Sequence, residues 1–302
     1  MKILGKYRNG NYNVTVFDDG TKVRANDLDF FAPEKPESMD IKITNMCDMG
    51  CPFCHENSTA DGLHGDIMNL KFMDTLLPYT ELAIGGGNPL THPDLIPFLK
   101  KCKSLHLIPS MTINQVHFMR DEYIELVDML VREKLIYGLG ISLVKVTDEF
   151  IERVKKFPNA VIHIINGVQP LSEVKKLYDH NLKVLILGYK EFRRGLNYYS
   201  KEVENLKSDY YNELKEMVNH FNVVSFDNLA LKQLEAKRLL SQEEWDQYFM
   251  GDDGSMTCYI DCVNQQYSIC SLSPLSNRFP LKDDIGEMFR HINELRKTEV
   301  RQ

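Results

Sequence analysis

The stretch Cys47-Asp48-Met49-Gly50-Cys51-Pro52-Phe53-Cys54 places three thiols within one short, turn-rich segment. It follows the strand-like run Met39-Asp40-Ile41-Lys42-Ile43-Thr44, so the thiols are expected in a loop at the carboxyl end of a strand. Parallel α/β proteins build their sites at that end of their strands. Gly50 and Pro52 permit the tight wrapping that lets three sulfurs converge. The sequence therefore predicts a metal centre on an α/β scaffold.

The number of local thiols bears on which metal they hold. A structural zinc ion normally has four protein ligands, and only three are close together here. His55 would complete a Cys₃His set, but its position directly after Cys54 makes convergence on the same ion sterically awkward. A four-iron cluster held by three thiolates keeps one iron open for chemistry. We therefore favour a cluster at Cys47, Cys51 and Cys54, with zinc as the alternative.

From residue 39 onward, short apolar runs alternate with charged stretches of helical spacing. Thr147-Asp148-Glu149 is typical of a helix N-cap followed by an acidic first turn. Six strands joined by helical crossovers predict an α/β fold with a parallel sheet, open or curled into a partial barrel. The predicted strands are Asp40 to Thr44, Leu82 to Gly85, Ile108 to Ile113, Gly138 to Leu143, Val161 to Ile165 and Val184 to Leu187, and the predicted helices lie near 67–77, 93–103, 121–133, 147–156 and 171–179.

Shorter elements flank this region. The N-terminal part predicts a β-hairpin of 12–17 and 21–24, followed by a break at 31–36. After residue 195 the sequence predicts a helix over 200–220, a strand at Val223 to Phe226 and a second hairpin within 256–270. Ser241-Gln242-Glu243-Glu244 resembles a capping box. The expected domains are an N-terminal β-hairpin and linker at 1–36, a core at 37–200 and a C-terminal α/β extension at 201–302.

A second motif lies directly after the second predicted strand, in Ile84-Gly85-Gly86-Gly87-Asn88-Pro89. Together the two motifs resemble the radical S-adenosylmethionine (radical SAM) superfamily. Its signature is Cys-x₃-Cys-x₂-Cys with an aromatic residue before the last cysteine, here Phe53, followed by a Gly-Gly-Glu-Pro segment. This chain has Asn88 where the family commonly has glutamate. The resemblance covers about residues 39–195.

The resemblance implies a partial (βα)₆ barrel and a [4Fe-4S] cluster on Cys47, Cys51 and Cys54 whose open iron binds S-adenosylmethionine. Reductive cleavage of that cofactor would give methionine and a 5′-deoxyadenosyl radical that abstracts hydrogen from a substrate. The glycines are expected to let the backbone approach the ligand, Asn88 to accept a hydrogen bond from the methionine ammonium, and Phe53 to lie near the adenine. The residues expected to bind the cofactor are Phe53, Gly86, Gly87, Asn88, Pro89, Ser142, Asn166 and Gly188.

The C-terminal part contains Cys258, Cys262 and Cys270. Strand alternation puts the first two on one face. A three-residue turn at 264–266 would place Cys270 on the same face, whereas a two-residue turn at 264–265 would separate it. Peptide-modifying radical SAM relatives carry auxiliary clusters in cysteine-rich extensions that this region weakly resembles. An auxiliary cluster and buried free thiols are the two interpretations.

Three basic residues lie on or just after the predicted strands. Arg193 and Arg194 follow the sixth predicted strand and are interpreted either as a solvated basic turn or as a bidentate carboxylate site. His163 lies within a predicted strand and is expected to be a core histidine with its hydrogen bonds satisfied.

Composition limits the partners. The chain has 302 residues, 43% of them hydrophobic, and 36 basic against 43 acidic side chains, a net charge of −7. That charge weighs against nucleic acid and anionic membranes. No apolar run approaches the roughly 20 residues of a membrane span, and the N-terminus turns polar too early for a signal peptide, so a cytoplasmic location is expected.

The expected function is therefore that of a radical SAM enzyme supplied with electrons by a donor such as flavodoxin or ferredoxin. A peptide or protein is the preferred substrate, because the β elements at both ends offer edge strands to an extended chain. A nucleoside or small metabolite is the alternative substrate. A non-catalytic zinc-binding regulatory module is the alternative of another class.

Overall fold

A computed structural model describes residues 1–28 and 30–299 of the chain. Its main feature is one sheet of ten strands in the order β10-β9-β8-β7-β6-β5-β4-β11-β12-β13. Strands β4 to β10 are parallel and follow the chain order. The bounds are β4 Ser38–Thr44, β5 Glu81–Gly86, β6 Ile108–Asn114, β7 Gly138–Ser142, β8 Ala160–Ile165, β9 Lys183–Leu187, β10 Val223–Phe226, β11 Thr257–Asp261, β12 Gln266–Ser268 and β13 Phe279–Pro280.

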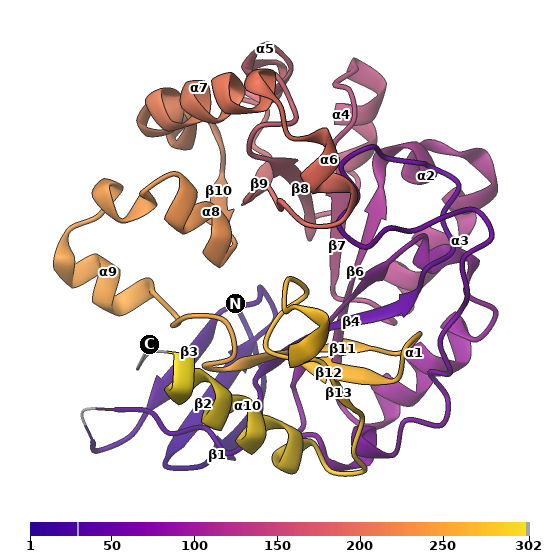
Figure 1. Cartoon of the computed structure of the whole chain (residues 1–302), viewed down its shortest axis with the longest axis vertical. Helices are drawn as coiled ribbons and strands as arrows, with labels where there is room; N and C mark the ends of the chain where they lie inside the picture. Colours follow the sequence, from indigo (N-terminus) through magenta and orange to yellow (C-terminus); the bar gives the residue numbers. More distant parts are fainter. Residues whose placement is uncertain (29, 300–302) are drawn as a thin grey trace.

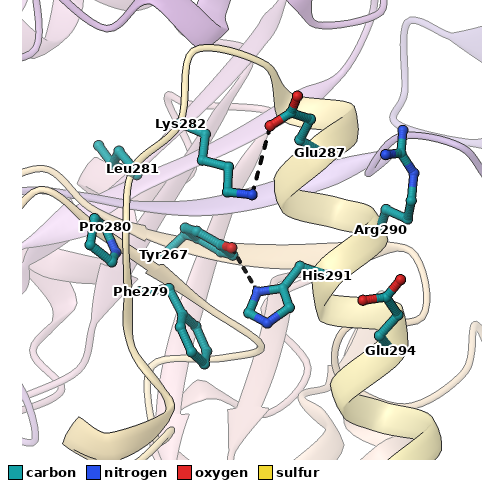
Figure 2. A pocket seen from close by; sticks show the side chains of 9 residues that line it. All are labelled: Tyr267, Phe279, Pro280, Leu281, Lys282, Glu287, Arg290, His291 and Glu294. Carbon is teal, nitrogen blue, oxygen red and sulfur yellow. Dashed lines mark hydrogen bonds and ion pairs between the residues drawn. The ribbon is translucent and has the colours of Figure 1, made fainter.

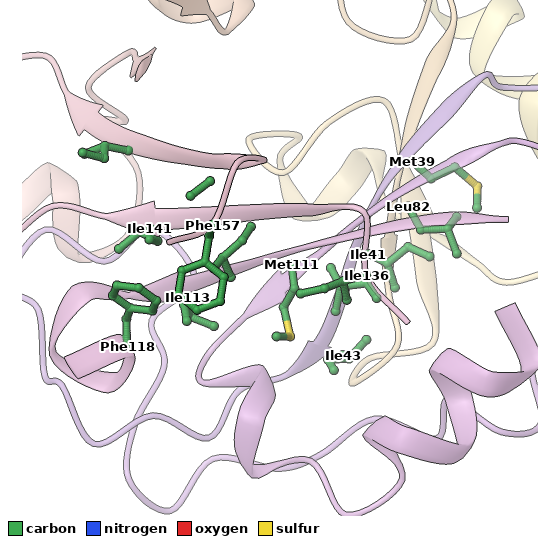
Figure 3. Close-up of a cluster of buried hydrophobic side chains, with 14 of the residues drawn as sticks. Met39, Ile41, Ile43, Leu82, Met111, Ile113, Phe118, Ile136, Ile141 and Phe157 are labelled. Carbon is green, nitrogen blue, oxygen red and sulfur yellow. The ribbon is translucent and has the colours of Figure 1, made fainter. Parts of the chain in front are cut away.

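Helices cover one face of the sheet and its two ends (Figure 1). Strand residues such as Ile41, Leu82, Met111 and Ile141 pack against helical residues such as Phe118 in one continuous core (Figure 3). The helices are α1 Leu95–Ser104, α2 Gln115–Met119, α3 Asp121–Arg132, α4 Asp148–Val154, α5 Leu171–Val174, α6 Arg194–Tyr198, α7 Lys201–Met217, α8 Asn228–Gln233, α9 Gln242–Tyr248 and α10 Ile285–Glu299.

The opposite face of the sheet has mainly small and polar side chains on its central strands. Residues that are side by side in a parallel register share a face, and this face has small side chains across β5, β6 and β7. Larger polar groups border it on both sides: Asp40 and Lys42 on β4, and His163 on β8. The small residues are Ala83, Gly85, Ser110, Thr112, Gly140 and Ser142. This face, together with the carboxyl ends of the strands, is where the fold leaves room for a site.

The N-terminal part forms a separate three-stranded antiparallel sheet in the order β1-β2-β3. The predicted hairpin is confirmed as β2 (Tyr12–Phe17) paired with β3 (Lys22–Ala25). The prediction of two strands alone was wrong, because β1 (Ile3–Asn9) pairs along the other side of β2. Its alternation is obscured by a register shift between Ile3 and Gly5 and by the buried polar residue Asn9.

The C-terminal part joins the same large sheet at both edges. Strand β10 pairs with β9, and β11 pairs in parallel with β4, so Asp261 lies beside Lys42. The second hairpin is confirmed as β11 and β12, but both predicted turn lengths were wrong. Ile260 is opposite Tyr267, and Asp261 folds the turn by accepting hydrogen bonds from the backbone N–H groups of Val263 and Asn264.

Most helices lie where the sequence predicts them, with one exception. Thr147 caps α4, and Ser241 and Glu244 form the capping box of α9. The helix predicted near 67–77 is instead a short 3₁₀ turn at Lys71–Thr75. Asp66 binds Asn69 in a preceding turn, and Pro78 follows, so no regular helix extends between them. Among residues 1–28 and 30–299, no helix combines the length and apolar character that crossing a membrane requires.

Candidate metal centre

The cysteine loop leaves the carboxyl end of β4 as predicted. Its entry is fixed by the Cys47 N–H, which donates to the Thr59 carbonyl at 2.7 Å. A tight turn follows, in which the Cys54 N–H donates to the Cys51 carbonyl at 3.2 Å. Gly50 has φ +60°, a conformation that favours glycine. All three thiols are half-buried, and burial raises the pKa of Cys47 and Cys51, so their thiolates need a positive partner.

The spacing of the thiols distinguishes a single ion from a larger group. In the part of the chain that the structure describes, only Cys47 belongs to a set of metal-ligand atoms within 4.8 Å of one another. A tetrahedral zinc ion with bonds of about 2.3 Å would bring all its sulfurs within roughly 4 Å. A cluster spreads its thiolates over separate irons. The loop therefore fits a cluster better than a closed zinc site.

The other members of that set, Asp48 and His117, form a clamp on the loop. His117 Nε2 lies 2.6 Å from Asp48 Oδ1, and Arg120 Nη1 lies 2.7 Å from Asp48 Oδ2. These hydrogen bonds, that of His117 first, lower the pKa of Asp48 to about 2. The carboxylate is thus engaged by protein donors, and it fixes the cysteine loop to α2 and the start of α3. Sequence reasoning missed this contact.

The glycine motif packs directly on the cysteine loop. The Gly87 N–H donates to the Thr44 carbonyl at 2.8 Å, and the Asn88 N–H donates to the Met46 carbonyl at 2.7 Å. A Cβ at Gly86 would lie 2.3 Å from the Thr44 oxygen, and one at Gly87 would lie 2.2 Å from the Met46 oxygen. At these two positions the absence of a Cβ therefore lets neighbouring protein backbone pack closely. The open position is Gly85, where a Cβ would meet nothing within 4 Å.

Alanine substitutions in this motif have sharply different expected effects. We expect Gly86→Ala and Gly87→Ala each to lower the free energy of unfolding by about 2–4 kcal/mol, because the new Cβ overlaps a carbonyl oxygen and Gly86 has φ +110°. Gly85→Ala is the matched control and is expected to leave stability unchanged. Urea denaturation of the apoproteins measures all three. Equal losses in the three variants would contradict this assignment.

Asn88 is buried, and its side-chain amide forms hydrogen bonds within the protein. Its Oδ1 accepts a hydrogen bond from the Leu90 N–H at 3.2 Å, which caps the 3₁₀ turn Pro89–Thr91, and its Nδ2 donates to Tyr123 Oη at 3.3 Å. The structure thus gives Asn88 a capping role that the sequence did not predict. Its expected contact with a methionine ammonium stays a prediction.

The remaining predicted cofactor residues lie along the same edge of the sheet. Ser142 ends β7, and Phe53 contacts Tyr198 of α6 with ring centroids 5.7 Å apart. Asn166 follows β8 and donates to Gln233 Oε1 at 3.1 Å, while its Oδ1 is buried with no partner among the residues described. Gly188 follows β9 and donates its N–H to Asp227. The fold therefore gathers these positions at one edge, as predicted, and their contact with a cofactor stays a prediction.

A buried charge network supports the loop from the side of β11. Lys42 is 1% exposed, and its Nζ lies 3.0 Å from Glu56 Oε2 and 3.3 Å from Asp261 Oδ2. Tyr259 donates to Glu56 Oε1 at 3.0 Å. Burial alone would raise the pKa of Glu56, but His55 and the ammonium of Lys42 hold it below its usual range. The network ties the end of the cysteine loop to the C-terminal strand, and its only sequence signal is a charge within each of two apolar strands.

The interpretation of Arg193 and Arg194 as a solvated basic turn was wrong. Both guanidinium groups clamp the segment that follows Cys54: Arg193 Nη1 donates to the Glu56 carbonyl at 2.8 Å, and Arg194 Nη2 donates to the Ser58 carbonyl at 2.6 Å. Arg193 Nη1 also lies 3.7 Å from the carboxylate oxygen Glu56 Oε2. Bidentate binding of a ligand's carboxylate stays a prediction.

His163 also differs from its prediction. It faces the side of the sheet opposite the helical core, over Gly140, where a Cβ would lie 2.4 Å from the imidazole ring. Within residues 1–28 and 30–299, neither ring nitrogen has a hydrogen-bond partner, and the side chain is only partly buried. Burial lowers the pKa of His163 to about 4. It is therefore neither a fully buried core histidine nor one held by hydrogen bonds.

This histidine predicts a pH dependence of stability. Its pKa is about 4 in the folded protein against an ordinary 6.5, so the unfolded chain binds the extra proton between those values and stability falls as pH drops from 6.5 to 4. We expect the free energy of unfolding of His163→Gln to fall by about 1–3 kcal/mol less than that of the wild type over this pH range. Urea denaturation of both apoproteins at pH 7.5, 5.5 and 4.5 measures it. Parallel profiles for the two proteins would contradict the prediction.

The C-terminal thiols do not share one face, which favours buried free thiols over an auxiliary cluster. Cys258 and Cys262 are buried on the core face, where Cys262 packs on Gly65. Cys270 follows the end of β12, with its Sγ 4.0 Å from Ser273 Oγ. The observed register does not place the three sulfurs on one face. Burial raises the pKa of Cys258 and Cys262, which is typical of inert core thiols.

A surface cavity of about 480 Å³ lies away from the cysteine loop, between α10 and the hairpin edge at β13 (Figure 2). His291 accepts or donates a 2.7 Å hydrogen bond with Tyr267 Oη, and Lys282 pairs with Glu287. Its lining mixes aromatic and oppositely charged side chains and contains no thiol of the described residues. The cavity therefore adds nothing to the metal centre.

Comparison with known proteins identifies the fold. No protein-family model matches the chain, and no curated protein matches it. Among solved structures, Streptococcus suis SuiB bound to precursor peptide SuiA has a TM-score of 0.59 at 16% identity, with 85% of this chain and 65% of SuiB covered. SuiB bound to S-adenosylmethionine has a TM-score of 0.60 at 13% identity, with coverages of 89% and 81%. The structure of anSMEcpe with bound AdoMet has a TM-score of 0.52 at 15% identity, with 83% of this chain and 79% of that chain covered.

The chain thus spans just under two thirds of the peptide-bound SuiB chain. At these identities the likeness concerns the fold. The chain therefore shares the α/β partial-barrel fold of these neighbours, as the sequence predicted.

Proposed function

We propose that this protein is a radical SAM enzyme that holds a [4Fe-4S] cluster on Cys47, Cys51 and Cys54. One observation carries the proposal: three half-buried thiols lie in one loop at the carboxyl end of the first barrel strand, and among the described residues they do not form a compact group with all their sulfurs within 4.8 Å of one another. Two structural neighbours of the same fold were solved with S-adenosylmethionine bound. The donor set, three thiolates and an open position, suits a cluster that binds that cofactor.

The residues around the loop define what this chain contributes. When bound and reduced, the cluster supplies the electron that cleaves S-adenosylmethionine into methionine and a hydrogen-abstracting 5′-deoxyadenosyl radical. Asp48, Glu56 and their partners fix the loop, and Gly85 leaves open space beside it. The small residues of β5 to β7 leave the sheet surface free for cofactor and substrate. An external donor such as flavodoxin or ferredoxin would deliver the electron.

A peptide or protein is the proposed substrate class. The neighbour SuiB was solved with its precursor peptide. In this chain β3 lies at the edge of the N-terminal sheet, with Val23 half exposed, and β13 lies at the edge of the large sheet. Edge strands bind extended peptides through backbone hydrogen bonds. These edges would hold a substrate outside the barrel while its reacting residue enters.

Anaerobic reconstitution tests the function. The full chain is loaded with iron and sulfide, its iron is counted, and 5′-deoxyadenosine is assayed after S-adenosylmethionine and dithionite are added. We expect about four irons per chain, a brown colour and 5′-deoxyadenosine formation. A colourless protein with one zinc ion and no 5′-deoxyadenosine would replace this function with that of a zinc-binding module.

A further inference from the structure

The segment after β9 wraps the cysteine loop closely. In α6, a Cβ at Gly195 would lie 2.1 Å from the Lys190 carbonyl oxygen and 3.4 Å from that of Phe53, so glycine allows this approach. Tyr198 of the same helix contacts Phe53. Arg193 has φ +52°, a strained conformation that neighbouring contacts must hold in place. The result is that two consecutive guanidinium groups reach the cysteine loop.

The two arginines differ in one respect. Arg194 donates a hydrogen bond from Nη2 to the Ser58 carbonyl oxygen, but its Nε is buried and has no acceptor among the residues described. Leaving a buried charged donor without an acceptor costs free energy, so we expect a bound group to supply the acceptor. Arg193 has no such buried, unpartnered nitrogen among the residues described.

We propose that Arg194 donates its Nε–H to a sulfur of the iron–sulfur cluster and sets the cluster's reduction potential. This inference rests on the proposed function. A four-iron cluster with three thiolates becomes more negative when it gains its electron. A nearby positive charge and a hydrogen bond to sulfur both stabilise that reduced form, and both are known to raise such potentials. Arg194 would thus make the cluster easier to reduce.

Redox titration of reconstituted proteins tests the proposal. Wild type, Arg194→Gln, Arg194→Lys and the control Arg193→Gln are loaded, their iron is counted, and the midpoint potential is measured by visible absorption. In Arg194→Gln we expect the ratio of reduced to oxidised cluster at a fixed potential to fall about tenfold, equivalent to about 59 mV for one electron. Arg194→Lys keeps the charge without Nε and should shift less. Arg193→Gln removes the hydrogen bond to the Glu56 carbonyl and the 3.7 Å ion pair with Glu56 Oε2, and it should shift the potential less than Arg194→Gln.

Each outcome decides the proposal. Equal potentials in Arg194→Gln and wild type, or equal shifts in the Arg193 and Arg194 variants, would show that Arg194 only anchors the loop and would leave the proposed function standing. If Arg194→Gln does not retain iron, Arg194→Lys decides, and a wild-type potential there overturns the proposed hydrogen bond. A wild-type protein that binds no cluster overturns both the inference and the proposed function.

Discussion

Replacing Cys47, Cys51 or Cys54 by alanine is expected to abolish cluster binding and 5′-deoxyadenosine formation in the full chain. All three thiols lie in the same loop at the end of β4. A variant keeps only two of these thiolates, and no other cysteine of the described residues lies beside the loop to replace the third. The loss should be complete rather than partial. Iron counting after reconstitution, followed by product assay, measures both effects.

Matched controls come from the C-terminal thiols. Cys258→Ala and Cys270→Ala are expected to keep about four irons per chain, because neither sulfur is part of the loop and the three C-terminal thiols do not share a face. A Cys47→Ala variant that still makes 5′-deoxyadenosine would contradict the proposed mechanism. About eight irons in the wild type would restore the auxiliary cluster that the hairpin register argues against.

Lys42→Met is expected to lower the free energy of unfolding of the apoprotein by about 3–5 kcal/mol. Lys42 lies between Glu56 and Asp261, which are 7% and 0% exposed, so its removal leaves two buried carboxylates with much less compensation. Such a loss far exceeds that of an exposed ion pair. Urea denaturation of the metal-free protein isolates this effect from any change in cluster binding.

The chain offers a control with the same substitution. Lys71 pairs with Asp283 at 2.9 Å, and both side chains are 74% exposed. Lys71→Met is therefore expected to cost less than about 1 kcal/mol. Similar losses in the Lys42 and Lys71 variants would mean that the buried network contributes no more to stability than a solvated pair.

The sequence was sufficient for the barrel strands and the cysteine motif. Alternating or continuous apolar runs located β4 to β10, because each of these strands buries one face against helices, and the ligand spacing located the metal centre. Local chemistry also located the caps at Thr147 and Ser241. These are features in which a residue and its neighbours along the chain determine the structure.

Contacts between distant segments were beyond the sequence. Alternation shows which face Asp261 occupies, but not that its strand pairs with β4, which brings it to Lys42 across 219 residues. The same limit applies to Arg194, whose neighbours come from a loop 136 residues earlier. Nor did the sequence show that the carbonyl oxygens of Thr44 and Met46 lie against Gly86 and Gly87. The expected approach of a ligand to these glycines stays a prediction.

The pairing of β11 with β4 has a consequence for the order in which the protein is made. The three cysteines leave the ribosome long before Asp261, so the growing chain carries an unpaired edge on β4, directly beside the metal loop. Parallel pairing across such a separation is slow, because the loop-closure entropy is lost before the contacts form. Emergence of β11, rather than emergence of the cysteines, is thus the event that encloses Lys42 and finishes the scaffold beside the cysteine loop.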